Sequence, residues 1–173
     1  MFADGPRTLI PAGPLEHTMG STKVDLRSVL DQVQSRAERA GVFDSVSCQG
    51  DSLVCQARGA AEPAFYRLDF RDGALTVSLE MEDRWLSESI EASLMNSGDA
   101  LEELLDDELA ELGYEGDEPT YRHFRSEAKR FTFETPILTD GLQGEALAER
   151  AAQFLLGYEA CFRQLGDMSQ SDD

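Results

Sequence analysis

The chain has 173 residues, of which 41% are hydrophobic and 28% charged, proportions typical of a folded domain. Its 15 Lys and Arg residues face 34 Asp and Glu residues, which gives a formal net charge of −19. Because so negative a surface repels phosphate backbones and anionic lipids, we expect neither nucleic acid nor a membrane as a partner. The acidity itself has two interpretations: a solvated shell that maintains solubility, for instance in a salty cytoplasm, or a face that binds a basic or aggregation-prone client protein.

We expect no membrane segment and no secretory signal. No stretch of the sequence approaches the roughly 20 apolar residues of a membrane-spanning helix, and Asp4 stands where the apolar run of a signal peptide would begin. The three cysteines, Cys48, Cys55 and Cys161, are an odd number without CxxC spacing. They predict a reduced, cytoplasmic protein with small buried thiols, the less favoured alternative being a disulfide between Cys48 and Cys55 across a hairpin.

The N-terminal residues 1–20 are rich in Gly and Pro without a sustained period, which predicts a flexible arm. A first helix follows, capped by Ser21 or Thr22, because apolar residues recur at helical spacing up to Ala37 and Gly41 can end the helix. Residues 169–173 are predicted to form a disordered acidic tail. A single domain is therefore expected to span residues 21–168.

Four strands are predicted next. Residues 42–48 and 53–57 flank Gly50-Asp51 and indicate a first hairpin. The strongest local pattern surrounds Asp72-Gly73, where apolar and polar residues alternate from residue 66 to 70 and from 75 to 81. This period of two predicts an antiparallel hairpin with one buried and one solvent-exposed face.

From Trp85 onward the apolar residues follow a helical period. Asn96-Ser97-Gly98 interrupts this region, and Asp99 begins a second helix with Glu102 as its capping-box partner. The second helix has an apolar stripe that includes Leu101 and Leu105, and its other face carries six acidic residues and no basic one. Because like charges oppose helix formation, we expect tertiary or subunit contacts to hold this helix in place.

The last third of the chain predicts two strands and a long helix. The strands are residues 121–126 and 131–135. Together with the turn between them they contain the only basic stretch of the sequence, with Arg122, His123, Arg125, Lys129 and Arg130. Residues 145–165 then show regular helical spacing. The predicted order is α-ββββ-α(α)-ββ-α. Strands that are grouped without βαβ alternation predict an α+β fold, an antiparallel sheet with helices packed on it.

The sequence predicts no catalytic, cofactor or metal site, and we therefore do not expect an enzyme. Of the two histidines, His17 lies in the arm and His123 in a strand, so a catalytic triad or a histidine-rich metal cluster would depend on His123 alone. With 34 acidic residues, close carboxylate pairs arise by chance. Trp85 is interpreted as an anchor in the core or in an interface, in preference to a ligand platform.

In its order of elements the chain resembles the type III secretion chaperones and their YbjN-like relatives. The resemblance spans residues 22–166 and covers the leading helix, the strand meander, the helix region, the strand pair and the closing helix. The hairpin of residues 42–57 and the N-terminal arm depart from the pattern. The resemblance implies a homodimer that binds extended segments of a client or a regulatory partner, and it implies no catalytic residues.

Two functional hypotheses follow. The first is a non-enzymatic, chaperone-like or regulatory protein that acts as a homodimer and binds an unidentified protein client, with candidate partner-binding residues Trp85, Leu101, Leu105, Arg122, His123, Arg125, Lys129 and Arg130. The second is a small-molecule sensor or an enzyme with a pocket between sheet and helices. The basic hairpin has two corresponding roles: it compensates the acidic helix of residues 101–112, within one chain or across a dimer, or it binds an acidic group of a partner.

Overall fold

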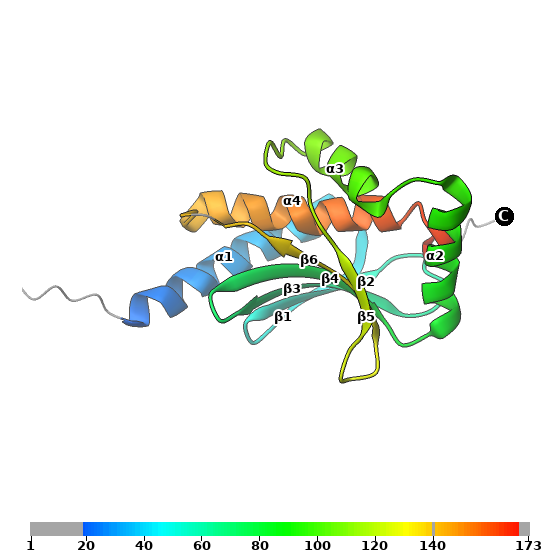
Figure 1. The fold of residues 1–173 in the computed structure, drawn as a ribbon. Coiled ribbons are helices and arrows are strands. Elements are labelled where there is room, and N and C mark those ends of the chain that lie inside the picture. Colours follow the sequence, from blue (N-terminus) through cyan, green and yellow to red (C-terminus); the bar gives the residue numbers. More distant parts are fainter. Residues whose placement is uncertain (1–18, 140, 170–173) are drawn as a thin grey trace, which may run out of the picture.

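The computed structural model describes residues 19–139 and 141–169, with side chains described from residue 26 onward. Six strands form one antiparallel sheet in the order β1-β2-β3-β4-β6-β5, and the helices pack on one of its faces (Figure 1). This confirms the predicted α+β class and element order. The elements are α1 (Met19–Ala40), β1 (Phe43–Gln49), β2 (Ser52–Ala57), β3 (Ala64–Arg71), β4 (Ala74–Met81), α2 (Arg84–Ser97), α3 (Leu101–Glu111), β5 (Arg122–Arg125), β6 (Phe131–Ile137), α4 (Gly144–Phe162) and the 3-10 turn η1 (Gly166–Met168).

The predicted hairpins all form. In the turn between β3 and β4, Asp72 and Gly73 have φ angles of 52° and 76°, the left-handed pair that a two-residue turn between twisted strands requires. The first helix begins at Met19, two residues before the predicted caps Ser21 and Thr22, whose side chains lie outside the described part. The predicted arm and tail lie outside the described residues too, except that residues 19 and 20 belong to α1 and that Ser169 is described.

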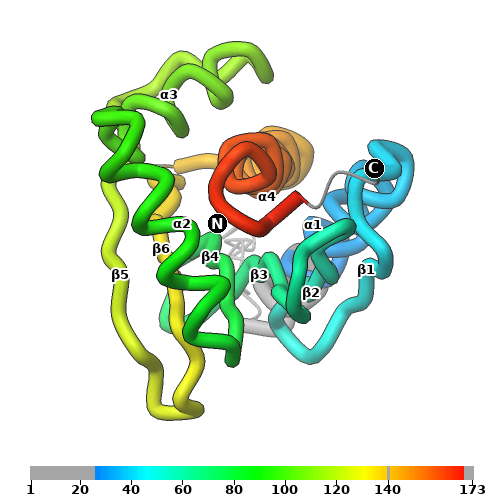
Figure 2. Tube along the Cα trace, turned by 90° about the vertical axis from the view of Figure 1, so that its right-hand side faces the viewer, coloured from blue at the N-terminus to red at the C-terminus, as the bar shows by residue number. Residues whose placement is uncertain are grey.

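The two faces of the sheet differ in character. On the helix face, Leu68 and Leu79 have no exposed surface, and Phe133 packs its ring 5.1 Å from that of Phe162 in α4. Helix α4 lies over the middle of the sheet, with α1 beside it on the side of β1 and β2 (Figure 2). None of the described helices covers the opposite face, which carries polar side chains such as Glu80. The period of two in β3 and β4 thus marks a sheet that the described helices cover on one side only.

Helices α2 and α3 are the two pieces of the predicted broken helix. Asp83 caps α2 by accepting the Leu86 N–H at 2.7 Å, and Gly98, with φ of 74°, ends this helix. The predicted capping box of Asp99 and Glu102 is wrong, because α3 begins one residue later than expected. Its N-cap residue is Ala100, which has no capping side chain.

Leucines attach α3 to α4. Leu101, Leu105 and Leu109 are at most 2% exposed, and Gly157 of α4 lets them approach closely. A β-carbon on residue 157 would lie 2.8 Å from Leu109 Cδ2. The expectation that tertiary contacts hold this acidic helix is therefore confirmed. Within the described part of the chain, no helix combines the length and the apolar character that crossing a membrane requires.

Candidate functional site

The candidate site lies where the β5–β6 hairpin meets the start of α2. A cavity of about 510 Å³ opens there between the helix and the two strands. The strand register places the hairpin residues: His123 of β5 pairs with Phe133 of β6, and Arg125 pairs with Phe131. The Asp83 cap fixes the first turn of α2 beside them. The cavity is lined by side chains from α2, from the residues before it and from both strands: Glu82, Arg84, Ser87, Glu88, Glu91, His123, Arg125 and Phe131.

A hydrogen-bonded row of three side chains crosses this cavity. Ser87 Oγ lies 3.2 Å from His123 Nε2, and His123 Nδ1 lies 2.8 Å from Glu91 Oε1. Ser87 and Glu91 are one helical turn apart in α2, so both reach the same strand. The His123 ring stacks on Phe133, with centroids 3.9 Å apart and planes 5° from parallel. A carboxylate at Nδ1 favours the proton on that nitrogen and leaves Nε2 of a neutral ring as the acceptor for the Ser87 hydroxyl.

Solvent exposure increases along this row from Ser87 to Glu91. Ser87 is only 2% exposed, whereas the His123 side chain is 22% and the Glu91 side chain 47% exposed. The hydroxyl therefore lies at the inner end and the carboxylate at the solvent-facing end. This is the arrangement of a hydroxyl, a base and an orienting carboxylate, a constellation that is recognised by geometry and not by position in the sequence.

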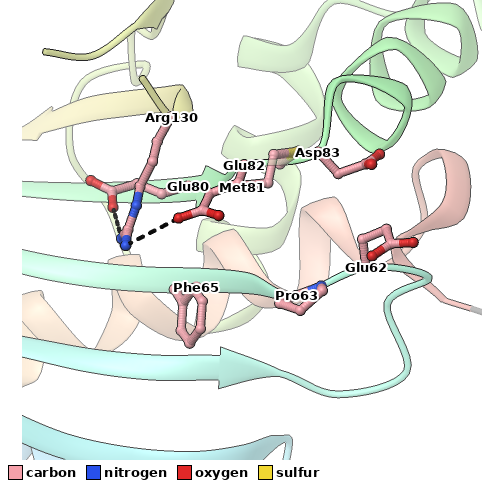
Figure 3. A pocket seen from close by; sticks show the side chains of 8 residues that line it. All are labelled: Glu62, Pro63, Phe65, Glu80, Met81, Glu82, Asp83 and Arg130. Atoms are coloured by element: carbon pink, nitrogen blue, oxygen red, sulfur yellow. Dashed lines mark hydrogen bonds and ion pairs between the residues drawn. The ribbon is translucent and has the colours of Figure 1, made fainter. Parts of the chain in front are cut away.

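A second hollow of about 530 Å³ lies on the other side of Glu82, near the start of α2 (Figure 3). Arg130 reaches into it from the β5–β6 hairpin, and its guanidinium lies 3.3 Å from Glu80 and 3.7 Å from Glu82. Phe65 and Pro63 form its apolar side. Because Arg130 already has two carboxylate partners, this hollow offers little free positive charge.

The cations of the hairpin are partly paired within the chain. Arg122 lies 2.7 Å from Glu134 and stacks over the ring of Phe124, and Arg130 has the partners described above. Arg125 stacks 5.5 Å above Phe131, and neither it nor Lys129 forms an ion pair with any described residue.

The acids of α3 form no ion pair with the hairpin in the described part of the chain. The ion pairs of the described residues therefore give no direct support to compensation of α3 by the hairpin within one chain. The strands and α2 supply the nearer carboxylates Glu134, Glu80, Glu82 and Glu91. Compensation across a dimer and binding of an acidic partner stay predictions.

The outer face of α2 exposes two large apolar side chains next to the ion pair of Arg84 and Glu88. Trp85 is 75% and Met95 83% exposed, and the exposed Ala92 lies between them on the same side of the helix. Trp85 is thus no core residue of the chain, and of its two predicted roles the interface anchor is the one that stays a prediction. Leu101 and Leu105 pack against α4 in the core, and we leave them out of the candidate site.

Sequence reasoning did not single out Ser87 and Glu91. Their spacing of four in a predicted helix signals a shared face, but their meeting with His123 depends on how α2 docks on the sheet.

Comparison with protein-family models, with curated proteins and with solved structures gives no match, so these comparisons do not bear on the resemblance to type III secretion chaperones. Among the described residues, no group of three or more His, Cys, Asp or Glu side chains is arranged to hold a metal ion.

Proposed function

We propose that this chain is a protein-binding domain that forms a homodimer through the outer face of α2 and the adjoining β5–β6 hairpin. The observation that supports it most directly is the exposure of Trp85 and Met95 on one side of α2. Tryptophan is enriched among the residues that dominate binding energy at interfaces, and methionine adapts to varied partner surfaces. Two such side chains on one helix face are costly to leave in water and favour a partner that covers them.

The charges that lack partners suit a second copy of the chain as that partner. Lys129, in the turn of the hairpin, forms no ion pair with a described residue, and neither do the exposed acids Glu103 and Asp107 of α3. In a two-fold dimer the hairpin of each copy can face α3 of the other, and the contact then occurs twice. Compensation across a dimer thus becomes the role of the hairpin, with the apolar face of α2 at the centre of the interface.

The oligomeric state tests this proposal. Sedimentation equilibrium at micromolar concentrations should give twice the 19.1 kDa of one chain. Trp85 is the only tryptophan, so its emission reports this surface alone. We expect the emission to shift to longer wavelength on dilution, as the dimer dissociates and the indole enters water. A mass of 19.1 kDa throughout, with emission independent of concentration, would contradict the proposal.

Matched variants separate the α2 face from general surface effects. Met95→Ser should weaken the dimer on the order of fivefold or more, since truncation of a dominant residue at the centre of an interface costs above about 1 kcal/mol. Leu138→Ser is the control, because Leu138 is also an exposed apolar residue, 47% exposed, but follows β6 at its far end. Equal effects of the two substitutions would argue against α2 as the interface.

A client protein and a cytoplasmic location belong to the same proposal. The sheet face that no described helix covers and the edge strand β1 suit the addition of an extended segment, as in the chaperone-like class that the element order resembles. The three free thiols of the chain are consistent with a reducing compartment. The alternative, a small-molecule sensor or an enzyme, is favoured by one specific observation, the Ser87–His123–Glu91 row in its cavity.

A further inference from the structure

The row of Ser87, His123 and Glu91 carries an inference that is independent of any dimer. We propose that Ser87 is a nucleophile, His123 its general base and Glu91 the positioning residue of a site that hydrolyses small carboxylic esters. This departs from the sequence-based prediction of no enzyme, which rested on a triad's dependence on His123 alone and on carboxylate pairs that arise by chance. The constellation is assembled from residues 36 positions apart in the chain, so no local motif would have revealed it.

The orientation of Ser87 is the first argument. A serine within a helix usually hydrogen-bonds a backbone carbonyl of the preceding turn, and Ser89 of the same helix does so, donating to Leu86 O at 2.7 Å. Ser87 instead points its hydroxyl at His123 Nε2, 3.2 Å away. Although it is 2% exposed, it contributes to the lining of the cavity. The hydroxyl is therefore held against a base, on a residue that borders the space that a small molecule could enter.

The environment of Ser87 is the second argument. It lies in the first turn of α2, where the helix dipole favours negative charge. Asp83 accepts the N–H of Leu86, while the N–H groups of Arg84 and Trp85 precede any partner within the helix. Arg125 lines the same cavity without an ion pair to a described residue. Stabilisation of the oxygen that becomes negative during attack on an ester carbonyl requires donors of this kind.

The reaction balances with water as the only co-reactant. Ser87 Oγ forms a bond to the carbonyl carbon while its proton passes to His123 Nε2, and the carbonyl π pair moves onto the oxygen. Collapse of this intermediate breaks the bond to the alcohol, which leaves with the proton from Nε2. Water then attacks the acyl-serine with His123 again as base, and the acid is released with free Ser87. Glu91, 2.8 Å from Nδ1, holds the ring and stabilises its positive charge in both steps.

The cavity indicates the class of substrate. A volume of about 510 Å³ that is open to solvent suits a small ester and not a buried lipid chain. Phe131 supplies an apolar wall, and the free charge of Arg125 favours a substrate with an anionic substituent. We therefore expect the preferred substrates to be esters with a short acyl chain and with a negatively charged substituent on the acyl or the alcohol part.

Labelling with a fluorophosphonate probe tests the proposal. Such a probe phosphonylates an activated serine with loss of fluoride, and peptide mapping by mass spectrometry locates the adduct. We expect one adduct on Ser87 of the native chain and hydrolysis of p-nitrophenyl acetate that the probe abolishes. Ser87→Ala should remove both. Ser93→Ala, which changes a half-buried serine of the same helix, is the matched control and should leave both unchanged.

Substitution of the base and of the carboxylate completes the test. His123→Gln should slow labelling on the order of 100-fold or more, the contribution of a positioned general base. Glu91→Gln, at the solvent-facing end of the row, retains the packing of the core and should slow labelling by roughly tenfold with a shifted pH profile. Absence of an adduct on the native chain, an adduct elsewhere, or equal labelling rates of a folded Glu91→Gln or His123→Gln variant would overturn the proposal.

Discussion

Gly166 lies so close to Ser89 that a β-carbon on residue 166 would be 2.5 Å from the carbonyl carbon of Ser89. This contact, with the hydrogen bond from Asp167 N–H to Ser89 Oγ at 3.0 Å, fixes α2 to the segment after α4. We predict that Gly166→Ala lowers the free energy of unfolding by about 2–4 kcal/mol, since overpacking adds to the strain of a φ of 52°. Chemical denaturation measures this loss.

Gly98→Ala is the matched control for that substitution. Gly98 also has a left-handed φ, 74°, but nothing lies within 4 Å of the position of an added β-carbon. We expect it to cost only the conformational strain, about 1–2 kcal/mol. Equal losses for the two variants would show that the contact between Gly166 and Ser89 adds nothing to the docking of α2.

The open face of the sheet contains a glutamate shared by two arginines. Glu80 lies 3.7 Å from Arg67 and 3.3 Å from Arg130, and the buried Nε atom of Arg67 has no hydrogen-bond partner among the described residues. We predict that Glu80→Gln lowers the free energy of unfolding by about 1–3 kcal/mol, because two guanidinium groups lose a half-buried counter-charge. Thermal unfolding is the measurement. Glu134→Gln, which breaks only the contact with the exposed Arg122, should cost about 0–1 kcal/mol, and a larger loss there than at Glu80 would refute this ranking.

The three thiols should differ in reactivity. Burial raises the pKa of Cys55 and of Cys161 to about 12. Cys48 is half-buried and donates to Gln34 Oε1 at 3.1 Å. Burial also raises the pKa of Cys48, but the positive charge of Arg27 lowers it in part. Only the thiolate attacks a disulfide reagent. We predict that Ellman's reagent modifies Cys48 in the native chain and all three thiols after unfolding. The Cys48→Ser variant should then show no native-state reaction, and fast modification of two or three thiols in the native chain would contradict this order.

Glu159 should make stability depend on pH. Burial in α4 raises the pKa of this carboxyl above its ordinary 4.5, and Arg163, 3.5 Å away, offsets only part of the effect. The folded chain therefore binds this proton more tightly than the unfolded chain, and stability falls as pH rises through the raised pKa. We predict that Glu159→Gln is more stable than the native sequence at neutral pH, with a difference that shrinks as pH falls towards 4.5.

Comparison of the two proteins by denaturation at several pH values isolates this one group, because all other carboxyls are common to both. A difference in unfolding free energy that does not change between pH 4 and 7 would contradict the prediction. A lower stability of Glu159→Gln at neutral pH would show instead that the ion pair with Arg163 outweighs the burial of the carboxylate.

Local patterns predict most of this fold because each element carries its own signal. The alternation around Asp72-Gly73 and the stripe of the last helix need no information from distant residues. The cap of α3 was mispredicted because Asp99 and Glu102 satisfy the capping-box pattern, whereas packing of the leucines on α4 determines where the helix begins. Asp83, the cap that does form, was overlooked because it follows directly on a strand.

The site was predictable only in part. The basic composition of the hairpin is visible in the sequence, and so is the position of Trp85 at the start of a predicted helix. That Trp85 faces solvent, and that Leu101 and Leu105 do not, depends on how α2 and α3 dock. The contact of Ser87 with His123 joins a helix to an edge strand, and no period or spacing along the chain encodes such a distance.

The attachment of α3 through one face has a further consequence. Its buried leucines contact α4, while its six acids repel one another and form no ion pair with a described residue. An element stabilised by packing on one side and opposed by its own charge opens at a lower free-energy cost than the sheet beneath it. Its amide hydrogens should therefore exchange with solvent before those of α4, most readily at low ionic strength. Gly157, where the two helices touch, would then be uncovered while the sheet and its hairpins remain intact.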